Sequence, residues 1–216
     1  MSYANNIYLQ SAEYINSDSP EVISFAKRNI GNSTNPIEKA VKLYYAIRDG
    51  FQYNPHDVDL SAEAMKASSL LKRDYGYCIE KACLLAACAR AVGIPSRLAF
   101  AKVRNHIGTE KLEKALKTDV LVFHGFTEMF IEGKWVKATP AFNKTLCDKL
   151  NVEPLEFDGM HDSIFQTYNK EGNKFMEYLH DYGNFPDVPR DLFISELKKN
   201  YPHMFEKGNM TWKVSG

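Results

Sequence analysis

Apolar residues recur every three or four positions along the N-terminal part of the chain, the spacing of helices that bury one face. The clearest segment spans residues 34–50, where Asn35-Pro36 is a typical helix start. Its apolar face comprises Ile37, Ala40, Val41, Tyr44, Tyr45 and Ile47. Similar patterns predict helices at about residues 20–29, before Gly31, and at about 62–71.

A longer segment, residues 76–97, is the one around which the chain is organised. Its stretch from Ile79 to Val92 is rich in Ala and Leu, and Gly93 followed by Pro95 is a stop signal, so we predict a helix. The charged residues in this helix do not gather on one side, which indicates a helix buried on most sides. The small Ala residues of this helix would let neighbouring elements come close, which suits a central helix packed against a sheet.

Further along, the pattern changes to that of strands. Residues 97–103 read as one strand, and residues 119–131 and 135–139 read as a hairpin joined at Glu132-Gly133. A two-residue turn at that place puts Phe126 opposite Thr139. His124, two residues away on the same face, becomes a diagonal neighbour of Thr139.

The remaining segments are less regular. Residues 108–117 are charged and predict a short surface helix or lid, and we expect further helices at about residues 165–179 and 189–199. We interpret the chain as one domain over residues 1–216, with a core at about 35–145 and a helical C-terminal elaboration at about 146–216. A chain of 216 residues can bury a core of that size.

Composition excludes several classes of partner. The net charge is 0, and 44% of the residues are hydrophobic. This balance gives no electrostatic reason to expect nucleic acid or an anionic membrane surface as a partner. The N-terminus lacks a basic and apolar leader, and no apolar run reaches transmembrane length. We therefore expect a cytoplasmic protein.

The four cysteines do not have the spacing of a disulfide framework or a zinc site. Cys78, Cys83 and Cys88 lie five residues apart within the predicted helix, so successive side chains point in different directions. Cys83, Cys88 and Cys147 are interpreted as small buried thiols. His56-Asp57-Val58-Asp59 is read as a solvated turn rather than a metal site, and we predict no metal or cofactor.

Cys78 differs from the other cysteines because it lies in the first turn of the helix. There its sulfur is near free backbone N–H groups and the positive end of the helix dipole, both of which favour thiolate. The alternative is a buried apolar thiol. Together with His124 on a following strand, Cys78 has the arrangement of a Cys-His nucleophile pair.

Two motifs give this pair its context. The first is Gly76-x-Cys78, followed by Gly93-Ile94-Pro95-x-Arg97, and the second is His124-x-x-x-Glu128, followed by Gly133-x-Trp135 and later Pro140. With them the chain resembles the transglutaminase-like superfamily, the papain-related group that contains transglutaminases, peptide N-glycanases and many bacterial proteins assigned as cysteine proteases. The resemblance covers about residues 35–145.

The resemblance implies an α+β fold with a papain/transglutaminase-like core, in which a buried helix with an N-terminal Cys packs on an antiparallel sheet that carries the histidine. It also implies extra helices at both ends and acyl chemistry on amides or thioesters. One position departs from the family, where an aspartate normally precedes the proline and this chain has Thr139. Asn143 is the alternative residue to orient the histidine, and Glu128 lies on the same strand face.

The leading hypothesis is thus a cysteine-dependent amide hydrolase, peptidase-like, with Cys78 as nucleophile and His124 as general base. The Cys78 N–H would supply one oxyanion donor, and Gln52, Tyr53 or Tyr77 the second. Acyl transfer to amines, as in transglutaminases, is an alternative outcome of the same chemistry. A different alternative is a catalytically decayed peptide-binding module, favoured by Thr139. The expected partner is a peptide or another amide-containing substrate.

Overall fold

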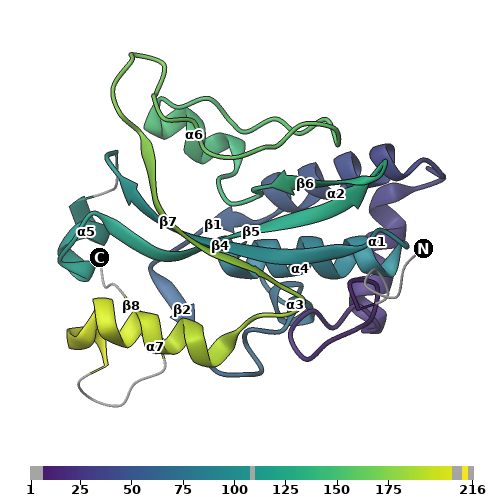
Figure 1. Cartoon of the computed structure of the whole chain (residues 1–216), viewed down its shortest axis with the longest axis horizontal. Coiled ribbons are helices and arrows are strands. Elements are labelled where there is room, and N and C mark those ends of the chain that lie inside the picture. The colour runs from purple at the N-terminus through teal and green to yellow at the C-terminus, as the bar shows by residue number, and fades with distance from the viewer. Residues whose placement is uncertain (1–6, 108–109, 206–210, 214–216) are drawn as a thin grey trace.

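The computed structural model describes residues 7–107, 110–205 and 211–213 (Figure 1). The helices are α1 (Pro20–Ile30), α2 (Pro36–Gly50), α3 (Ala67–Leu70), α4 (Cys78–Ala91), α5 (Glu110–Leu116), α6 (Lys144–Leu150) and α7 (Arg190–Asn200), with a 3-10 turn η2 (Pro202–Met204). The strands are β1 (Gln52–Tyr53), β2 (Asp57–Asp59), β3 (Tyr75–Gly76), β4 (Ser96–Asn105), β5 (Val120–Ile131), β6 (Lys134–Ala138), β7 (Met176–Phe185) and β8 (Thr211–Lys213).

Four strands form the main sheet, which is antiparallel and has the order β6-β5-β4-β7. Helix α4 packs on β4 and β5 and is surrounded by α1, α2 and α3. Figure 1 shows α6 and α7 on opposite sides of these strands, with α5 at the end where β5 begins. This is the α+β fold that the sequence predicts, with the cysteine helix on an antiparallel sheet.

Helices α1 and α2 lie where the sequence predicts them, and the expected start and stop residues are at their ends. Helix α2 begins after Asn35, whose side-chain oxygen accepts hydrogen bonds from the N–H groups of Ile37 (2.8 Å) and Glu38 (3.3 Å). That cap satisfies donors that the first turn would otherwise leave free. Helix α1 ends at Gly31, which has a φ of 57°.

Helix α4 is buried along nearly its whole length, as predicted: every residue from Cys78 to Arg90 is buried. Its two buried cations, Lys81 and Arg90, tolerate burial because they donate hydrogen bonds to backbone carbonyls. Lys81 has no exposed surface, and its ammonium donates to the carbonyls of Arg48 (2.9 Å), Phe51 (2.8 Å) and Ala141 (2.8 Å). Burial lowers the pKa of Lys81 to about 7.

The hairpin β5–β6 has the predicted turn and register. Glu132 and Gly133 have φ angles of 49° and 84°, and Thr127 pairs with Ala138. Positive φ at both turn residues is the hairpin geometry whose twist matches that of the strands. Continuing this register by one residue puts Phe126 opposite Thr139, as the sequence predicts.

One predicted helix is much shorter than expected, and another is wrong. In the segment 62–71 only Ala67–Leu70 is helical, and the rest is mostly turns. The segment 165–179 contains a turn in which the Asn169 side chain accepts from the N–H groups of Glu171 and Asn173, and the chain then enters strand β7. Asn and Gly residues favour a turn in this segment, and β7 pairs with β4. These interactions outweigh the helix-like spacing of the apolar residues.

No helix in the described part of the chain is both long enough and apolar enough to span a membrane.

Candidate active site

Cys78 is the first residue of α4 and is 8% exposed. Burial raises the pKa of its thiol to about 11, although the nearby backbone N–H groups of Gly125 and Ile79 act in the opposite direction. The donors expected at a helix N-terminus are therefore present. The expected net preference for thiolate is wrong for this closed geometry, because the cost of desolvating a charged sulfur is larger.

The N-terminus of α4 is fixed by Glu80, a buried acid two residues beyond the cysteine. Its carboxylate accepts a hydrogen bond from the N–H of Tyr77 (3.1 Å) and forms an ion pair with Arg73. Burial raises the pKa of Glu80 to about 7, against the opposing effect of Arg73. The carboxylate thus holds the turn that presents Cys78.

Close packing favours a glycine at position 76. A Cβ at this position would lie 2.7 Å from Leu70 Cδ1 and 3.1 Å from Glu80 Oε2, and Gly76 is not among the residues with positive φ. Lack of space, rather than an unusual backbone angle, favours glycine before the cysteine.

His124 lies on β5, opposite Ala101 of β4, and is 2% exposed. Its ring packs against that of Phe165, with centroids 5.0 Å apart and an angle of 43° between the ring planes. Burial lowers the pKa of His124 to about 4, so the imidazole is neutral at neutral pH. Its Nε2 is buried and has no hydrogen-bond partner in the described structure.

Cys78 and His124 line one small cavity of about 60 Å³. The other lining residues are Tyr53, Pro55, Tyr77, Ile79, Leu112, Leu116, Leu121, Val122, Phe123, Phe193, Leu197 and Tyr201. Within the described residues, no hydrogen bond joins the two side chains. The structure therefore brings the predicted nucleophile and base to one cavity, with a neutral thiol and a neutral imidazole.

The geometry of β5 explains how a helix residue and a strand residue meet there. Gly125 faces α4, since a Cβ on it would lie 3.2 Å from Ile79 Cα, and the alternation of side chains puts His124 on the other face. Cys78 lies beside the edge of β5, where the Gly125 N–H reaches its sulfur. From that edge it lines the same cavity as His124.

Thr139 directly follows β6 and is 1% exposed. Both of its backbone polar groups are hydrogen-bonded: the N–H donates to Ser163 O (3.1 Å), and the carbonyl accepts from the Tyr44 hydroxyl (3.1 Å). Its Oγ1 is buried without a partner, like Nε2 of His124. The hydrogen bond expected between these two groups is not formed.

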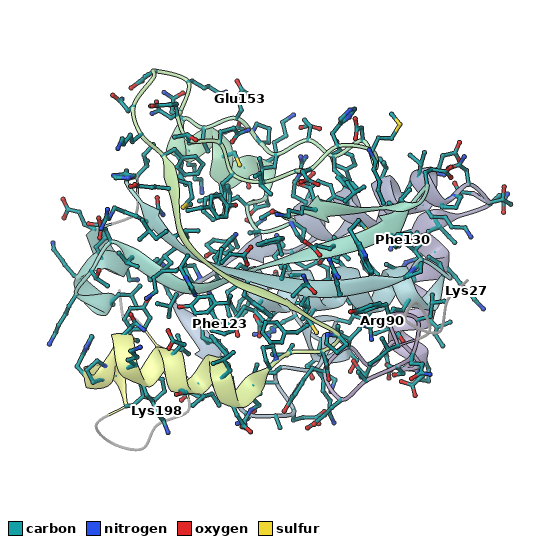
Figure 2. All side chains as sticks on the ribbon, in the orientation of Figure 1. Lys27, Arg90, Phe123, Phe130, Glu153 and Lys198 are labelled. Atoms are coloured by element: carbon teal, nitrogen blue, oxygen red, sulfur yellow. The ribbon has the colours of Figure 1, made fainter. Side chains whose placement is uncertain are left out.

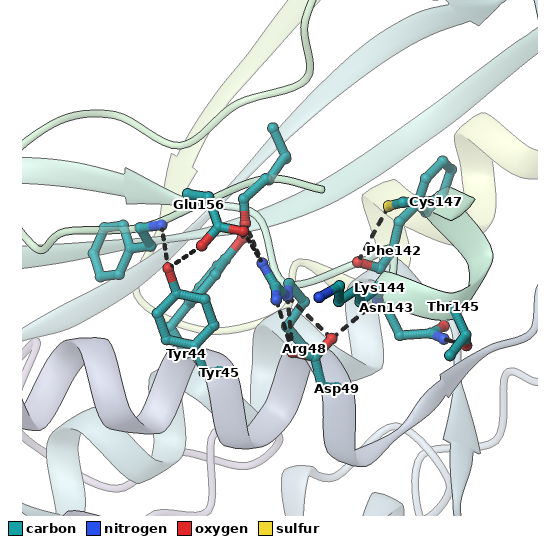
Figure 3. Close-up of polar contacts among 12 residues, drawn as sticks. Tyr44, Tyr45, Arg48, Asp49, Phe142, Asn143, Lys144, Thr145, Cys147 and Glu156 are labelled. Atoms are coloured by element: carbon teal, nitrogen blue, oxygen red, sulfur yellow. Dashed lines mark hydrogen bonds and ion pairs between the residues drawn. The ribbon is translucent and has the colours of Figure 1, made fainter. Parts of the chain in front are cut away.

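Asn143, the alternative orienter of the histidine, uses its amide elsewhere (Figure 3). Its oxygen accepts from the N–H of Tyr53 (2.9 Å), and its nitrogen donates to Gln52 Oε1 (3.1 Å) and Thr145 Oγ1 (2.6 Å). None of its hydrogen bonds goes to His124. The amide instead joins the start of α6 to the short strand that carries Tyr53.

The three candidates for the second oxyanion donor are separated by the structure. Tyr53 lines the same cavity as Cys78, and burial together with the neighbouring Cys78 raises the pKa of Tyr53 well above its usual value. Tyr77 is buried and its hydroxyl has no partner, while the Gln52 side chain is exposed. Tyr53 is therefore the candidate whose hydroxyl is coupled to the Cys78 thiol.

Glu128 has a structural partner, because its carboxylate forms an ion pair with Arg97 of β4 at 2.5 Å.

Among residues 7–107, 110–205 and 211–213, no group of three or more His, Cys, Asp or Glu side chains could hold a metal ion.

The model of the transglutaminase-like superfamily matches residues 23–140, more than half of the 216-residue chain. The chain belongs to the transglutaminase-like superfamily. The match includes both motifs, with Cys78 and His124, and ends at Pro140. No curated protein matches the sequence of this transglutaminase-like protein.

Solved structures with the same fold include a protein described as a putative cysteine protease from Cytophaga hutchinsonii, with 17% identity and a TM-score of 0.54. That match covers 88% of this chain and 50% of the other, so the chain spans half the length of the Cytophaga protein. A second match is a protein described as a putative protease from Parabacteroides distasonis, with 20% identity, a TM-score of 0.40 and coverage of 63% and 25%. A third is arylamine N-acetyltransferase from Salmonella typhimurium, with 12% identity, a TM-score of 0.47 and coverage of 85% and 71%. At 17% identity, the similarity to the Cytophaga protein concerns the fold.

Three residues of this transglutaminase-like site are missed by reasoning from the sequence. Phe165 packs against His124, Tyr201 lines the cavity, and Lys81 connects α4 to the segments before β1 and after β6. Phe165 and Tyr201 come from C-terminal segments outside the two motifs, and Lys81 looks in the sequence like an ordinary surface cation. Only their tertiary contacts identify them.

Proposed function

We propose that this protein is a cysteine-dependent amide hydrolase that forms an acyl-enzyme on Cys78, with His124 as general base and acid. Membership of the transglutaminase-like superfamily supports cysteine-based hydrolysis or acyl transfer in general. The observation that carries the assignment to this pair is geometric. Cys78, with N–H donors directed at its sulfur, lines the same cavity as His124.

The protonation states favour a general-base route. With the pKa of the thiol raised to about 11 and that of the imidazole lowered to about 4, an ion pair is not the resting state. The neutral imidazole of His124 takes the thiol proton as the sulfur attacks the amide carbonyl, and returns it to the leaving amine. Water then hydrolyses the thioester by the same route.

The oxyanion of the tetrahedral intermediate has two candidate donors. One is the backbone N–H of Cys78, which lies in the first turn of α4 where N–H groups have no partner within the helix, and the other is the hydroxyl of Tyr53, which lines the same cavity. Donors that are fixed before reaction stabilise the developing charge without reorganising. The hydrogen bonds of Asn143 to Tyr53 and Gln52 help to fix strand β1, which carries Tyr53.

A decayed peptide-binding module is the second candidate. The unpartnered Nε2 of His124 and the unpartnered hydroxyl of Thr139 support it, because an active pair usually has its imidazole oriented by a third group. In that case the fold and cavity remain while turnover is lost.

The experiment is site-resolved alkylation of the folded protein with iodoacetamide at pH 6, read by mass spectrometry. Cys83 and Cys88 are matched controls, because they lie on the same helix and are fully buried. We expect Cys78 to react at least about tenfold faster than either control, and His124→Ala to remove most of that difference. Equal reactivity of Cys78 with and without His124, in a folded variant, would favour the decayed module.

A further inference from the structure

One edge of β5 lacks a neighbouring strand close to Cys78. β6 pairs with residues 127–131 of β5 and ends at Ala138. In the described part of the chain, no strand lies beside residues 120–126 on that side. The backbone groups directed to this side therefore need partners from elsewhere.

Alternation identifies these groups. The N–H of Phe130 donates to Pro95 O, ahead of β4, so the N–H of Gly125 points away from β4 and toward Cys78. An irregularity in the pairing, with Phe123 at a φ of 56°, shifts the alternation before His124. Val120 and Val122 consequently present backbone groups on the same edge as Gly125.

One hydroxyl group makes hydrogen bonds with the carbonyl of Val120 and the N–H of Val122. Tyr201, which follows α7, donates to Val120 O (2.7 Å) and accepts from the N–H of Val122 (2.9 Å). A carbonyl and an N–H two residues apart on one strand edge are the groups that one residue of a parallel neighbouring strand bridges with its own N–H and C=O. The phenol thus takes the place of a residue of peptide backbone.

The surroundings of this edge are apolar. Leu112 and Leu116 of α5 and Phe193 and Leu197 of α7 line the cavity, and no Asp, Glu, Lys or Arg does. Phe123, labelled in Figure 2, packs against Phe193 with ring centroids 5.5 Å apart. A ligand here gains from apolar side chains and meets no fixed charge, which disfavours an ionic small molecule.

We propose that the edge of β5 at Val120 and Val122 is the binding site for the backbone of an extended peptide with apolar side chains, and that Tyr201 occupies this site until the peptide replaces it. The inference rests on the proposed function, since it names the substrate class of the same site. Pairing of main chain with a strand edge supplies affinity, and the apolar cavity beside Cys78 selects side chains.

The test measures binding rather than catalysis. In a Cys78→Ala background, the affinity of a fluorescein-labelled Ala-Leu-Leu-Leu-Ala peptide amide is determined by fluorescence anisotropy, together with analogues N-methylated at one position each. N-methylation at the position that donates to Val120 should weaken binding about tenfold, and methylation at positions facing solvent should change it less than about twofold.

Tyr201→Phe keeps the ring and removes the competing hydroxyl, so it should tighten binding about fivefold. Tyr182→Phe is the matched control, because the Tyr182 hydroxyl bonds Glu196 of α7 (3.0 Å) and not the edge of β5. The control should leave the affinity within about twofold. An equal gain from both variants would mean that loosening α7 is sufficient, and would overturn the specific role of the edge.

Absence of saturable binding, or equal tolerance of N-methylation at every position, also overturns the proposal. Neither result bears on the reactivity of Cys78 toward iodoacetamide, which tests the proposed function separately. Failure of the peptide site and failure of the nucleophile can thus be told apart.

Discussion

The two sides of the candidate site differ in how their polar groups are satisfied. On the cysteine side, N–H groups of Gly125 and Ile79 reach the sulfur, and Glu80 accepts from the N–H of Tyr77. On the histidine side, Nε2 of His124 and Oγ1 of Thr139 are buried without partners.

The difference follows from where the partners come from. Most groups around the sulfur are supplied by the first turn of α4 itself, so a short stretch of sequence builds them. A partner for the imidazole must come from another strand or loop, and the hairpin register brings a threonine near that place, which carries no charge. The sulfur therefore has backbone donors near it, although the buried hydroxyl of the adjacent Tyr77 has no partner, while the base side lacks the group that would stabilise an imidazolium.

The largest expected effect concerns acid stability. The pKa of His124 is lowered by burial to about 4, from about 6.5 in the unfolded chain. Between these values the unfolded chain binds a proton that the folded protein does not, so the free energy of unfolding should fall as pH drops through this window. The loss should reach about 3 kcal/mol near pH 4.

Chemical denaturation of wild type and His124→Gln from pH 7 to pH 4 measures this loss as the difference between the two curves. His180→Gln is the control, because His180 is exposed and forms no ion pair within the described residues. A His124→Gln curve parallel to that of wild type would contradict a buried neutral imidazole.

The support beneath the cysteine side can be broken at Lys81. Lys81→Met removes the ammonium that three buried carbonyls accept from, and leaves those carbonyls unpaired. We expect the free energy of unfolding to fall by about 2 kcal/mol, since loss of the hydrogen bonds exceeds the relief from burying a charge. Urea denaturation at pH 7 measures this fall in the free energy of unfolding. Lys39→Met is the control, because Lys39 is half-buried. An unchanged denaturation midpoint for Lys81→Met would mean that the ammonium makes no net contribution to stability.

The histidine side can be completed at Thr139. Thr139→Asp places a carboxylate where the family usually has one, which should raise the pKa of His124 and increase the rate of Cys78 alkylation at pH 6 about tenfold. NMR titration of the imidazole and mass spectrometry give the two readouts. Thr139→Asn separates orientation from charge, and an equal gain in that variant would show that charge is not what the site lacks.

The smallest effect is expected from Glu80, whose charge raises the pKa of Cys78. Glu80→Gln retains an oxygen for the Tyr77 N–H and removes the charge, so the thiol pKa should fall. A fall of half a unit corresponds to about threefold faster alkylation at pH 8. A slower reaction, with α4 intact by circular dichroism, would indicate that loss of the Arg73 ion pair has displaced Cys78.

The sequence by itself determined the elements whose signals are local. Asn35-Pro36 begins α2, the Ala-rich run after Cys78 forms a buried helix, and Glu132-Gly133 fixes the hairpin register. Because side chains alternate along a strand, that register was enough to place His124 and Thr139 on one face. The two motifs were enough to identify the family.

Only the tertiary structure decided the electrostatics and the covering of the site. Proximity to a helix N-terminus favours thiolate, but burial by residues from α5, α7 and Tyr201 reverses the net effect on Cys78, and no local pattern reports that burial. The segment 165–179 was read as helical because its apolar spacing is ambiguous over a short distance, and the Asn169 turn and pairing with β4 decide otherwise. Desolvation and strand pairing depend on residues distant in the chain, so they are fixed only when the chain has folded.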